Sequence, residues 1–165
     1  MSDFSEVLPD ILDLSGISWK EILERLYAVF QEDFKRQHAR HDGIQVLYDS
    51  RILPDGQGKE EGFWHVISTT DRETKERLID YRRAERLPWA KSMMEQHNIP
   101  QFRVFDYDTG RKDQGIRRYI CLADYSYVLI LKRKKRRFFW ITAYYIEKQW
   151  RRDKVAKRYN NRVRE

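Results

Sequence analysis

The sequence predicts an α+β fold, in which N-terminal helices pack on a four- to five-stranded antiparallel, twisted sheet and a basic helix ends the chain. Two observations lead to this fold class. Apolar residues recur at helical spacing in the first quarter of the chain, behind a capping box formed by Ser18 and Glu21. The last third instead contains runs of aromatic and β-branched residues separated by short turns, which is typical of an antiparallel meander.

The first half of the chain is predicted to be mainly helical. Residues 1–17 contain four acids and no cation, and are expected to form an acidic tail or short docking element ahead of one domain at 18–165. A helix is expected at about 18–37. The remaining elements are strands at 44–48 and 62–68 that could form a hairpin, a helix from the second capping box at Thr70 and Glu73 to about Arg86, and a helical piece at 89–97.

The second half is predicted to be a meander followed by the basic helix. Alternation at 102–107 indicates a strand, which Asp108–Gly110 closes in a turn. A turn composed of cations, residues 132–137, joins the last two strands. The expected elements after the first turn are strands at 117–121, 127–131 and 138–145, and a helix at about 147–164.

Composition favours a folded domain with a polyanionic partner. The chain has 165 residues, a net charge of +7 and 14% aromatic residues, which suits RNA, DNA or an acidic protein. Cys121 is the only cysteine, so there is no internal disulfide and no cysteine zinc site. With no run of roughly 20 apolar residues, we expect a cytoplasmic protein without a membrane partner. A domain cut from a larger secreted or injected protein would have the same features.

One histidine is a candidate for proton transfer. His65 stands between Trp64 and Val66 on a predicted strand, and an imidazole can act as a general acid or base near neutral pH. The alternative is a half-buried histidine bonded to the backbone. The histidines lack metal-ligand spacing, so neither a metal nor a cofactor is predicted.

Three arginines are candidates for phosphate contacts. Arg82, Arg83 and Arg86 lie within about one helical turn, and the guanidinium group matches the geometry of a phosphate. The alternative is a solvated helix face on which Asp80 and Glu85 are their partners.

The last predicted strand carries polar groups on one face. Alternation places Thr142 and Tyr144 together and Tyr145 on the opposite face. A hydroxyl and a phenol can bind phosphate or stack a base, although both residues are also common in ordinary strands. The cations predicted to bind nucleic acid are Lys134, Lys135, Arg136, Arg137, Arg151, Arg152, Lys154 and Lys157.

A magnesium site is the weaker alternative. Asp106 and Asp108 alternate on one strand and Asp113 follows, and paired carboxylates can hold the metal of a nuclease. However, Asp108 also begins a standard turn, and no Glu-x-Lys follows on the next strand.

Short motifs give the chain a family resemblance. Phe63–His65, Ile141–Tyr144, the arginine-bearing helix and the basic end resemble the barnase–EndoU–colicin–RelE (BECR) superfamily of ribonucleases, in its phage-borne and polymorphic-toxin branches, over roughly residues 43–160. The resemblance implies that His65 is the acid/base residue. It also implies that Thr142 and Tyr144 match the hydroxyl and aromatic residues of the superfamily's last strand. The chain lacks a second histidine of the kind that EndoU enzymes use, which leaves the partner acid open.

Together these observations predict a metal-independent endoribonuclease, a toxin or phage-associated effector that cleaves tRNA or another structured RNA by 2′-hydroxyl transesterification. His65 transfers protons, and Thr142 and Tyr144 position the phosphate. Arg83, Arg86 and basic residues near Arg151 stabilise its charge. One alternative is a non-catalytic RNA- or DNA-binding module. Another is an interaction domain that binds an acidic antitoxin or immunity protein.

Overall fold

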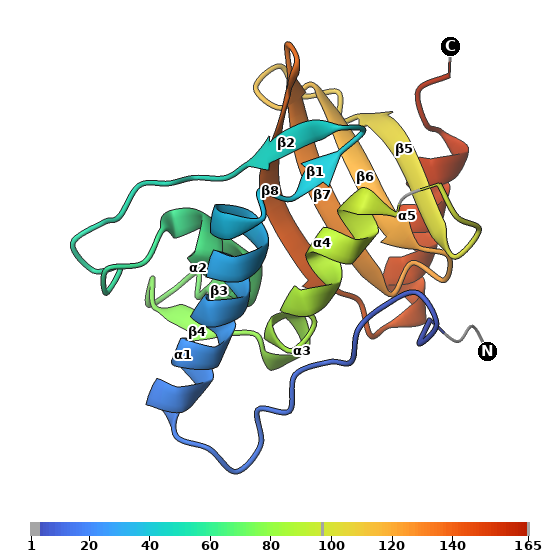
Figure 1. The fold of residues 1–165 in the computed structure, drawn as a ribbon. Coiled ribbons are helices and arrows are strands. Elements are labelled where there is room, and N and C mark those ends of the chain that lie inside the picture. The colour runs from blue at the N-terminus through green and yellow to red at the C-terminus, as the bar shows by residue number, and fades with distance from the viewer. Residues whose placement is uncertain (1–3, 97, 165) are drawn as a thin grey trace.

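The computed structural model describes residues 4–96 and 98–164, so the first three residues of the predicted acidic tail lie outside it. Its centre is a six-stranded sheet (Figure 1). The strands of this sheet are β1 (Arg40–His41), β2 (Ile44–Leu47), β5 (Phe102–Asp108), β6 (Ile116–Leu122), β7 (Tyr127–Lys134) and β8 (Arg137–Tyr145). Their order across the sheet is β1-β2-β8-β7-β6-β5.

The α+β class is confirmed, but the prediction of an all-antiparallel, four- to five-stranded sheet is wrong. β2 runs parallel to β8, with Val46 opposite Phe138 and Leu47 opposite Phe139. The meander from β5 to β8 is antiparallel, as predicted. The parallel pair joins segments that are far apart in the sequence, and local alternation contains no information about such a partner.

The first predicted helix is confirmed. α1 (Trp19–Phe30) begins at Ser18, whose Oγ accepts a hydrogen bond from the backbone N–H of Glu21 at 3.2 Å. The helix continues as the π-helical segment η1 (Gln31–Arg36). Together the two segments span nearly all of the predicted range of 18–37, and Phe30 and Phe34 are buried on their inner side.

Helices cover both faces of the sheet (Figure 1). On one face lie α1, α2 (Glu61–Ile67), α3 (Tyr81–Ala84) and α4 (Leu87–Glu95), and on the other lies α5 (Gln149–Asn160). Alternation along β6 follows this division: Ile120 belongs to the larger core beneath α1, α2 and α4, and Tyr119 belongs to the smaller core with Val155 of α5. The predicted helical piece at 89–97 and the basic C-terminal helix correspond to α4 and α5.

The predicted strand at 62–68 is wrong, because residues 62–67 belong to helix α2 and only Ser68 lies in a strand. Six of its seven residues are buried and only His65 is not, so the segment shows neither helical nor strand periodicity. Gly62 is required by a close contact: a Cβ there would lie 2.9 Å from the Cβ of Tyr48. The preceding loop also stabilises the helix start, since the carbonyls of Asp49 and Arg51 accept the N–H groups of Gly62 and Glu61.

The predicted long helix from Thr70 to Arg86 is also wrong. Its place is taken by a two-stranded sheet of β3 (Ser68–Thr70) and β4 (Arg77–Ile79), followed by the short helix α3. The Asp71 side chain accepts hydrogen bonds from the N–H groups of Glu73 and Thr74, at 2.9 and 2.8 Å. Asp71 therefore closes a tight turn with the same local bonding that a helix cap uses.

The described part of the acidic segment packs against the helices. The indole Nε1 of Trp89 donates to the carbonyl of Pro9 at 2.8 Å, and the N–H of Leu12 donates to the carbonyl of Glu85 at 2.9 Å. Leu8 is buried in the larger core. Among the helices in the described residues, none has the length and apolar character needed to cross a membrane.

Candidate active site

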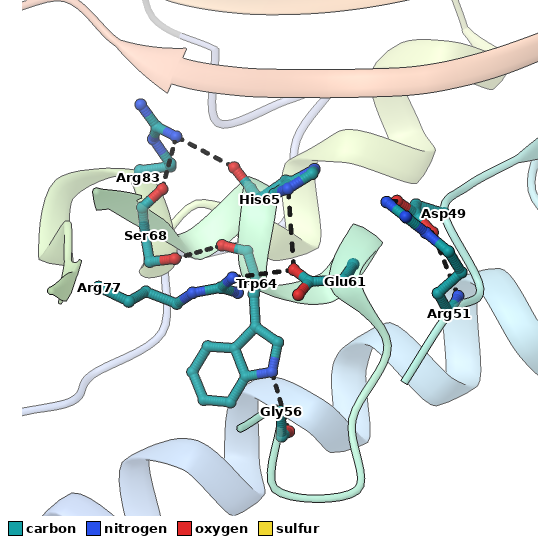
Figure 2. Close-up of polar contacts among 9 residues, drawn as sticks. All are labelled: Asp49, Arg51, Gly56, Glu61, Trp64, His65, Ser68, Arg77 and Arg83. Atoms are coloured by element: carbon teal, nitrogen blue, oxygen red, sulfur yellow. Dashed lines mark hydrogen bonds and ion pairs between the residues drawn. The ribbon is translucent and has the colours of Figure 1, made fainter. Parts of the chain in front are cut away.

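His65 lies at the end of α2 with its side chain 51% exposed, whereas the carboxylate of Glu61, one turn earlier, is only 4% exposed. The two face each other across an i, i+4 spacing, with 3.8 Å between His65 Nε2 and Glu61 Oε2 (Figure 2). Because the imidazole is half exposed and a buried carboxylate lies next to it, the imidazole can accept a proton from a ligand that binds at the surface. The histidine is not sealed in apolar packing.

Glu61 is itself held from a second element. Arg77 of β4 donates a hydrogen bond of 2.9 Å from Nη2 to Glu61 Oε2, and its guanidinium lies 5.3 Å from the ring centre of Trp64. The Trp64 indole in turn donates to the carbonyl of Gly56 at 3.0 Å (Figure 2). These contacts fix the carboxylate of Glu61 beside the half-exposed imidazole of His65.

Arg83 ties α3 to the end of α2. Its Nη1 donates to the carbonyls of His65 and Ser68, both at 3.1 Å (Figure 2). The Arg83 side chain is mostly buried, and Asp80 lies 3.7 Å from its Nε. Burial lowers the pKa of Arg83, and the charge of Asp80 opposes this effect. The structure therefore brings Arg83 and His65 together through the backbone of His65.

A cluster of three arginines surrounds Tyr145 at the end of β8. The guanidinium carbon of Arg86 lies 4.0 Å from the ring centre, with Arg82 at 5.7 Å and Arg152 at 6.0 Å. Arg152 Nη2 is also 3.5 Å from the Tyr145 hydroxyl. We call Arg82, Arg86, Tyr145 and Arg152 the Tyr145 cluster. It concentrates positive charge at the end of the strand on which α2 and α3 pack.

Arg86 is bound within the protein. Its Nη1 donates to the carbonyl of Arg82 at 2.8 Å and to Glu85 Oε1 at 2.7 Å, and only 12% of the side chain is exposed. Arg82 is 58% exposed and has a distant ion pair of 3.9 Å with Glu147. The predicted partners Asp80 and Glu85 are thus present, but Arg83 and Arg86 are not on a solvated face.

Thr142 and Tyr144 lie on the other face of β8 from Tyr145, as alternation predicted. Tyr144 packs into the smaller core, and Thr142 lies opposite Ile130, which packs against the same core. Burial raises the pKa of Tyr144 to about 12, and Tyr119 and Cys121 add to this shift. The structure does not bring these two side chains to the face that carries Tyr145.

A charged pair lies near His65. Arg51 Nη2 lies 2.6 Å from Asp49 Oδ2, and this hydrogen-bonded contact is the main reason why the pKa of Asp49 is lowered. The charge of His65 makes a smaller contribution in the same direction. Arg51 is 69% exposed, so it is a further cation that a ligand at His65 can reach (Figure 2).

The predicted nucleic-acid cations lie in two places. Arg151, Lys154 and Lys157 are exposed on α5, and the first two lie over the exposed ring of Trp150. The cations at 134–137 line a groove at the β7–β8 turn. None of the residues that line this groove comes from α5.

Asp106 is occupied by an ion pair. Arg118 Nε lies 2.5 Å from Asp106 Oδ1, and Arg118 Nη1 also contacts Asp42 and the buried His41. Within residues 4–96 and 98–164, no group of three or more His, Cys, Asp or Glu side chains is arranged to hold a metal ion.

Sequence reasoning missed Glu61 and Tyr145 as site residues. The i, i+4 spacing of Glu61 and His65 would have indicated the first, had the segment been read as a helix.

Comparisons of the chain with family models, with curated proteins and with solved structures give no match.

Proposed function

We propose that the chain is a metal-independent endoribonuclease that cleaves RNA by attack of a 2′-hydroxyl on the neighbouring phosphate. The observation that carries the proposal is the half-exposed imidazole of His65, held against the buried carboxylate of Glu61. A histidine oriented by a carboxylate is a common acid/base arrangement. The net charge of +7 supports a polyanionic substrate.

The chemistry can be assigned to atoms as follows. His65 removes the proton of the 2′-hydroxyl through Nδ1, the ring nitrogen that does not face Glu61, and Glu61, which lies 3.8 Å from Nε2, stabilises the positive charge that develops on the ring. The 2′-oxygen bonds to phosphorus while the bond from phosphorus to the 5′-oxygen breaks, which leaves a 2′,3′-cyclic phosphate. The departing 5′-oxygen takes a proton from an acid that is still to be identified, or from water.

Arg83, which contacts the backbone of His65, and the arginines of the Tyr145 cluster supply the charge that stabilises the pentavalent phosphate, which is often the largest contribution in such sites. Arg83 and Arg86 are held in place by carbonyl groups, so their charge is fixed before the substrate arrives. Arg82 and Arg51 are exposed enough to contact a phosphate directly. Tyr145 holds the guanidinium groups of Arg82, Arg86 and Arg152 around its ring, which keeps their charge in one place.

The phage-borne and polymorphic-toxin likeness in the sequence suggests tRNA or another structured RNA as the target. Single-stranded loops are favoured, because their bases can be splayed out and stacked. Thr142 and Tyr144 were expected to position the phosphate. We now assign that role to the Tyr145 cluster, since Tyr144 packs into the smaller core.

A non-catalytic nucleic-acid-binding module is the second candidate. The observation that favours it is the cationic groove at the β7–β8 turn, which could bind RNA without any acid/base residue. The two candidates differ only in the role of His65.

The test is cleavage of total RNA in excess EDTA by the parent protein, by His65→Asn and by the control His38→Asn. His38 is exposed and contacts Gln45. It has a left-handed φ of 50°, which asparagine also tolerates. We expect discrete fragments with the parent and the control, and a rate about 10²- to 10⁴-fold lower with His65→Asn.

Three results would count against the proposal. Absence of fragments with the parent would leave the binding module as the better reading. Equal cleavage by His65→Asn and the parent would remove His65 from the mechanism. Cleavage that requires added magnesium would instead favour a metal-dependent nuclease.

A further inference from the structure

The β7–β8 turn and the neighbouring strands form a groove of about 900 Å³ that is separate from the His65 site. Its walls are cationic and consist of Lys132 and the cations of 134–137. Its apolar part is formed by Leu47 and Phe139. These two residues are register partners in the parallel pair of β2 and β8, so they lie side by side.

The charge of the groove is not neutralised by the protein. Within the described ranges 4–96 and 98–164, no carboxylate forms an ion pair with Lys132, Lys134, Lys135, Arg136 or Arg137. Lys134 and Arg137 lie directly opposite each other across the ladder. Like charges in this position are destabilising, so an anion that binds between them relieves a cost already present in the free protein.

The turn itself uses residues that its geometry does not favour. Lys135 has a φ of 58°, in the left-handed region where asparagine and glycine are preferred in tight hairpins. A cation at this position contributes charge at the expense of local turn stability. Departures of this kind from local preference are expected at functional sites.

The apolar part narrows the class of ligand. Phe139 is 37% exposed and lies opposite Lys132 across the ladder, so an accessible ring stands next to a cation. A nucleotide combines a flat base that stacks on such a ring with a phosphate that pairs with the cations. A small inorganic anion would leave Phe139 and Leu47 without a partner.

We propose that this groove binds a single-stranded segment of the same RNA that reaches His65, at a distance from the cleaved bond. The inference rests on the proposed ribonuclease function for its catalytic consequence. Phe139 and Tyr145 lie at opposite ends of β8, and a strand rises about 3.3 Å per residue, so they are separated by roughly 20 Å along the strand. They also lie on opposite faces of the sheet, because Phe138 and Trp140, on either side of Phe139, face the larger core against which Tyr145 packs. A stacked strand rises about 3.4 Å per nucleotide, so an RNA that passes around the edge of the sheet needs at least about six nucleotides to reach from one to the other.

Binding is tested first, without reference to catalysis. Fluorescence anisotropy of a labelled 12-nucleotide RNA, 2′-O-methylated so that no 2′-hydroxyl is free to attack, is measured over a salt series for the parent, for Lys134→Gln/Arg136→Gln and for the control Arg111→Gln/Lys112→Gln. The control removes one lysine and one arginine from the exposed β5–β6 loop. We expect the groove variant, but not the control, to bind RNA about tenfold more weakly. The slope of log affinity against log salt concentration should be smaller by about 1.4 in the groove variant.

The stacking contribution has its own variant. Phe139→Leu keeps an apolar side chain and all of the charges. We expect it to weaken RNA binding about fivefold or more, with the salt slope unchanged. Equal affinity of the parent and both groove variants would overturn the proposal, as would an equal loss in the control. Tighter groove-dependent binding of a polyglutamate peptide than of RNA would also overturn it, and would favour an acidic protein partner.

Cleavage of a length series then separates this proposal from the proposed function. With the parent, KM should be lower for RNAs that extend more than about six nucleotides from the cleaved bond on one side than for shorter RNAs. With the groove variant, long and short RNAs should have the same KM. Cleavage without such a length effect would overturn the groove as an RNA site. Groove-dependent binding without any cleavage would support the groove and contradict the ribonuclease.

Discussion

The substitution Glu61→Gln tests whether the buried carboxylate acts through His65. It keeps the volume of the side chain and removes its charge. Glu61 Oε2 lies 2.9 Å from Arg77 Nη2 and 3.8 Å from His65 Nε2. The variant therefore affects one charge-assisted hydrogen bond and one electrostatic contact with the candidate base.

The expected loss of activity follows from the distance. Two unit charges 3.8 Å apart interact by about 1 kcal/mol at the dielectric constant of water and by about 4 kcal/mol at an effective value of 20. Because the imidazole is half exposed, the interaction lies near the lower end, at about 1–2 kcal/mol. If this energy is lost in the transition state, kcat falls about 5- to 30-fold.

The expected loss of stability is modest. A hydrogen bond to a charged group contributes about 1.5–3 kcal/mol, and Arg77 can still donate one to the amide oxygen of the variant, so only the part that depends on the charge of Glu61 is lost, about 1 kcal/mol. Arg77 is 30% exposed, and water can therefore solvate its charge in the variant. Urea unfolding monitored by tryptophan fluorescence measures this difference.

The neighbouring residue provides a matched control. Glu60 is equally buried, but its partners are Tyr27 and Lys35. Glu60→Gln should lose comparable stability and keep its kcat. In a His65→Asn background, Glu61→Gln should have no further effect on kcat, since residues that act as a unit are not additive. An equal loss of kcat in the Glu60 variant, or a full loss in the His65→Asn background, would refute the reasoning.

Two further outcomes are expected. Arg82→Gln should raise KM or lower kcat about tenfold and keep its free energy of unfolding within about 0.5 kcal/mol of the parent, because Arg82 is largely exposed. Arg86→Gln should instead lose about 1–3 kcal/mol of that free energy, because its internal hydrogen bonds are broken. Equal effects of the two variants on unfolding would contradict this assignment. Burial raises the pKa of Tyr144 to about 12, above the usual value of about 10 in an unfolded chain. The stability that this difference contributes is therefore fully present below about pH 10, and about 2–3 kcal/mol of it is lost as pH rises towards 12. The free energy of unfolding should fall less steeply between pH 10 and 12 in Tyr144→Phe than in the parent, and equal slopes would argue against the raised pKa.

Local signals predicted the parts of the fold that depend on local bonding. The capping box at Ser18 begins α1, and the alternation in 102–145 gives the antiparallel meander. The failures have two physical causes. A short segment that is buried on all sides, such as α2, has no visible period. An aspartate that caps a helix in one context closes a tight turn in another, as Asp71 does.

The same causes limited what could be predicted of the site. His65 was identified by its chemistry, but reading its segment as a strand hid the i, i+4 relation to Glu61. Tyr145 was placed correctly on the face opposite Tyr144, and its importance became visible only when the helices brought arginines onto its ring. Such contacts come from segments distant in sequence, which no local pattern encodes.

The burial of the arginines divides their roles. Arg83 and Arg86 were both expected to contact the phosphate, yet each binds backbone carbonyls and is only 12% exposed. A guanidinium held in this way cannot turn towards a ligand without breaking internal hydrogen bonds. Its charge nevertheless acts over several ångströms, and more strongly where water is excluded. We therefore assign the fixed positive field to Arg83 and Arg86, and direct contact with the substrate to the exposed Arg82 and Arg51.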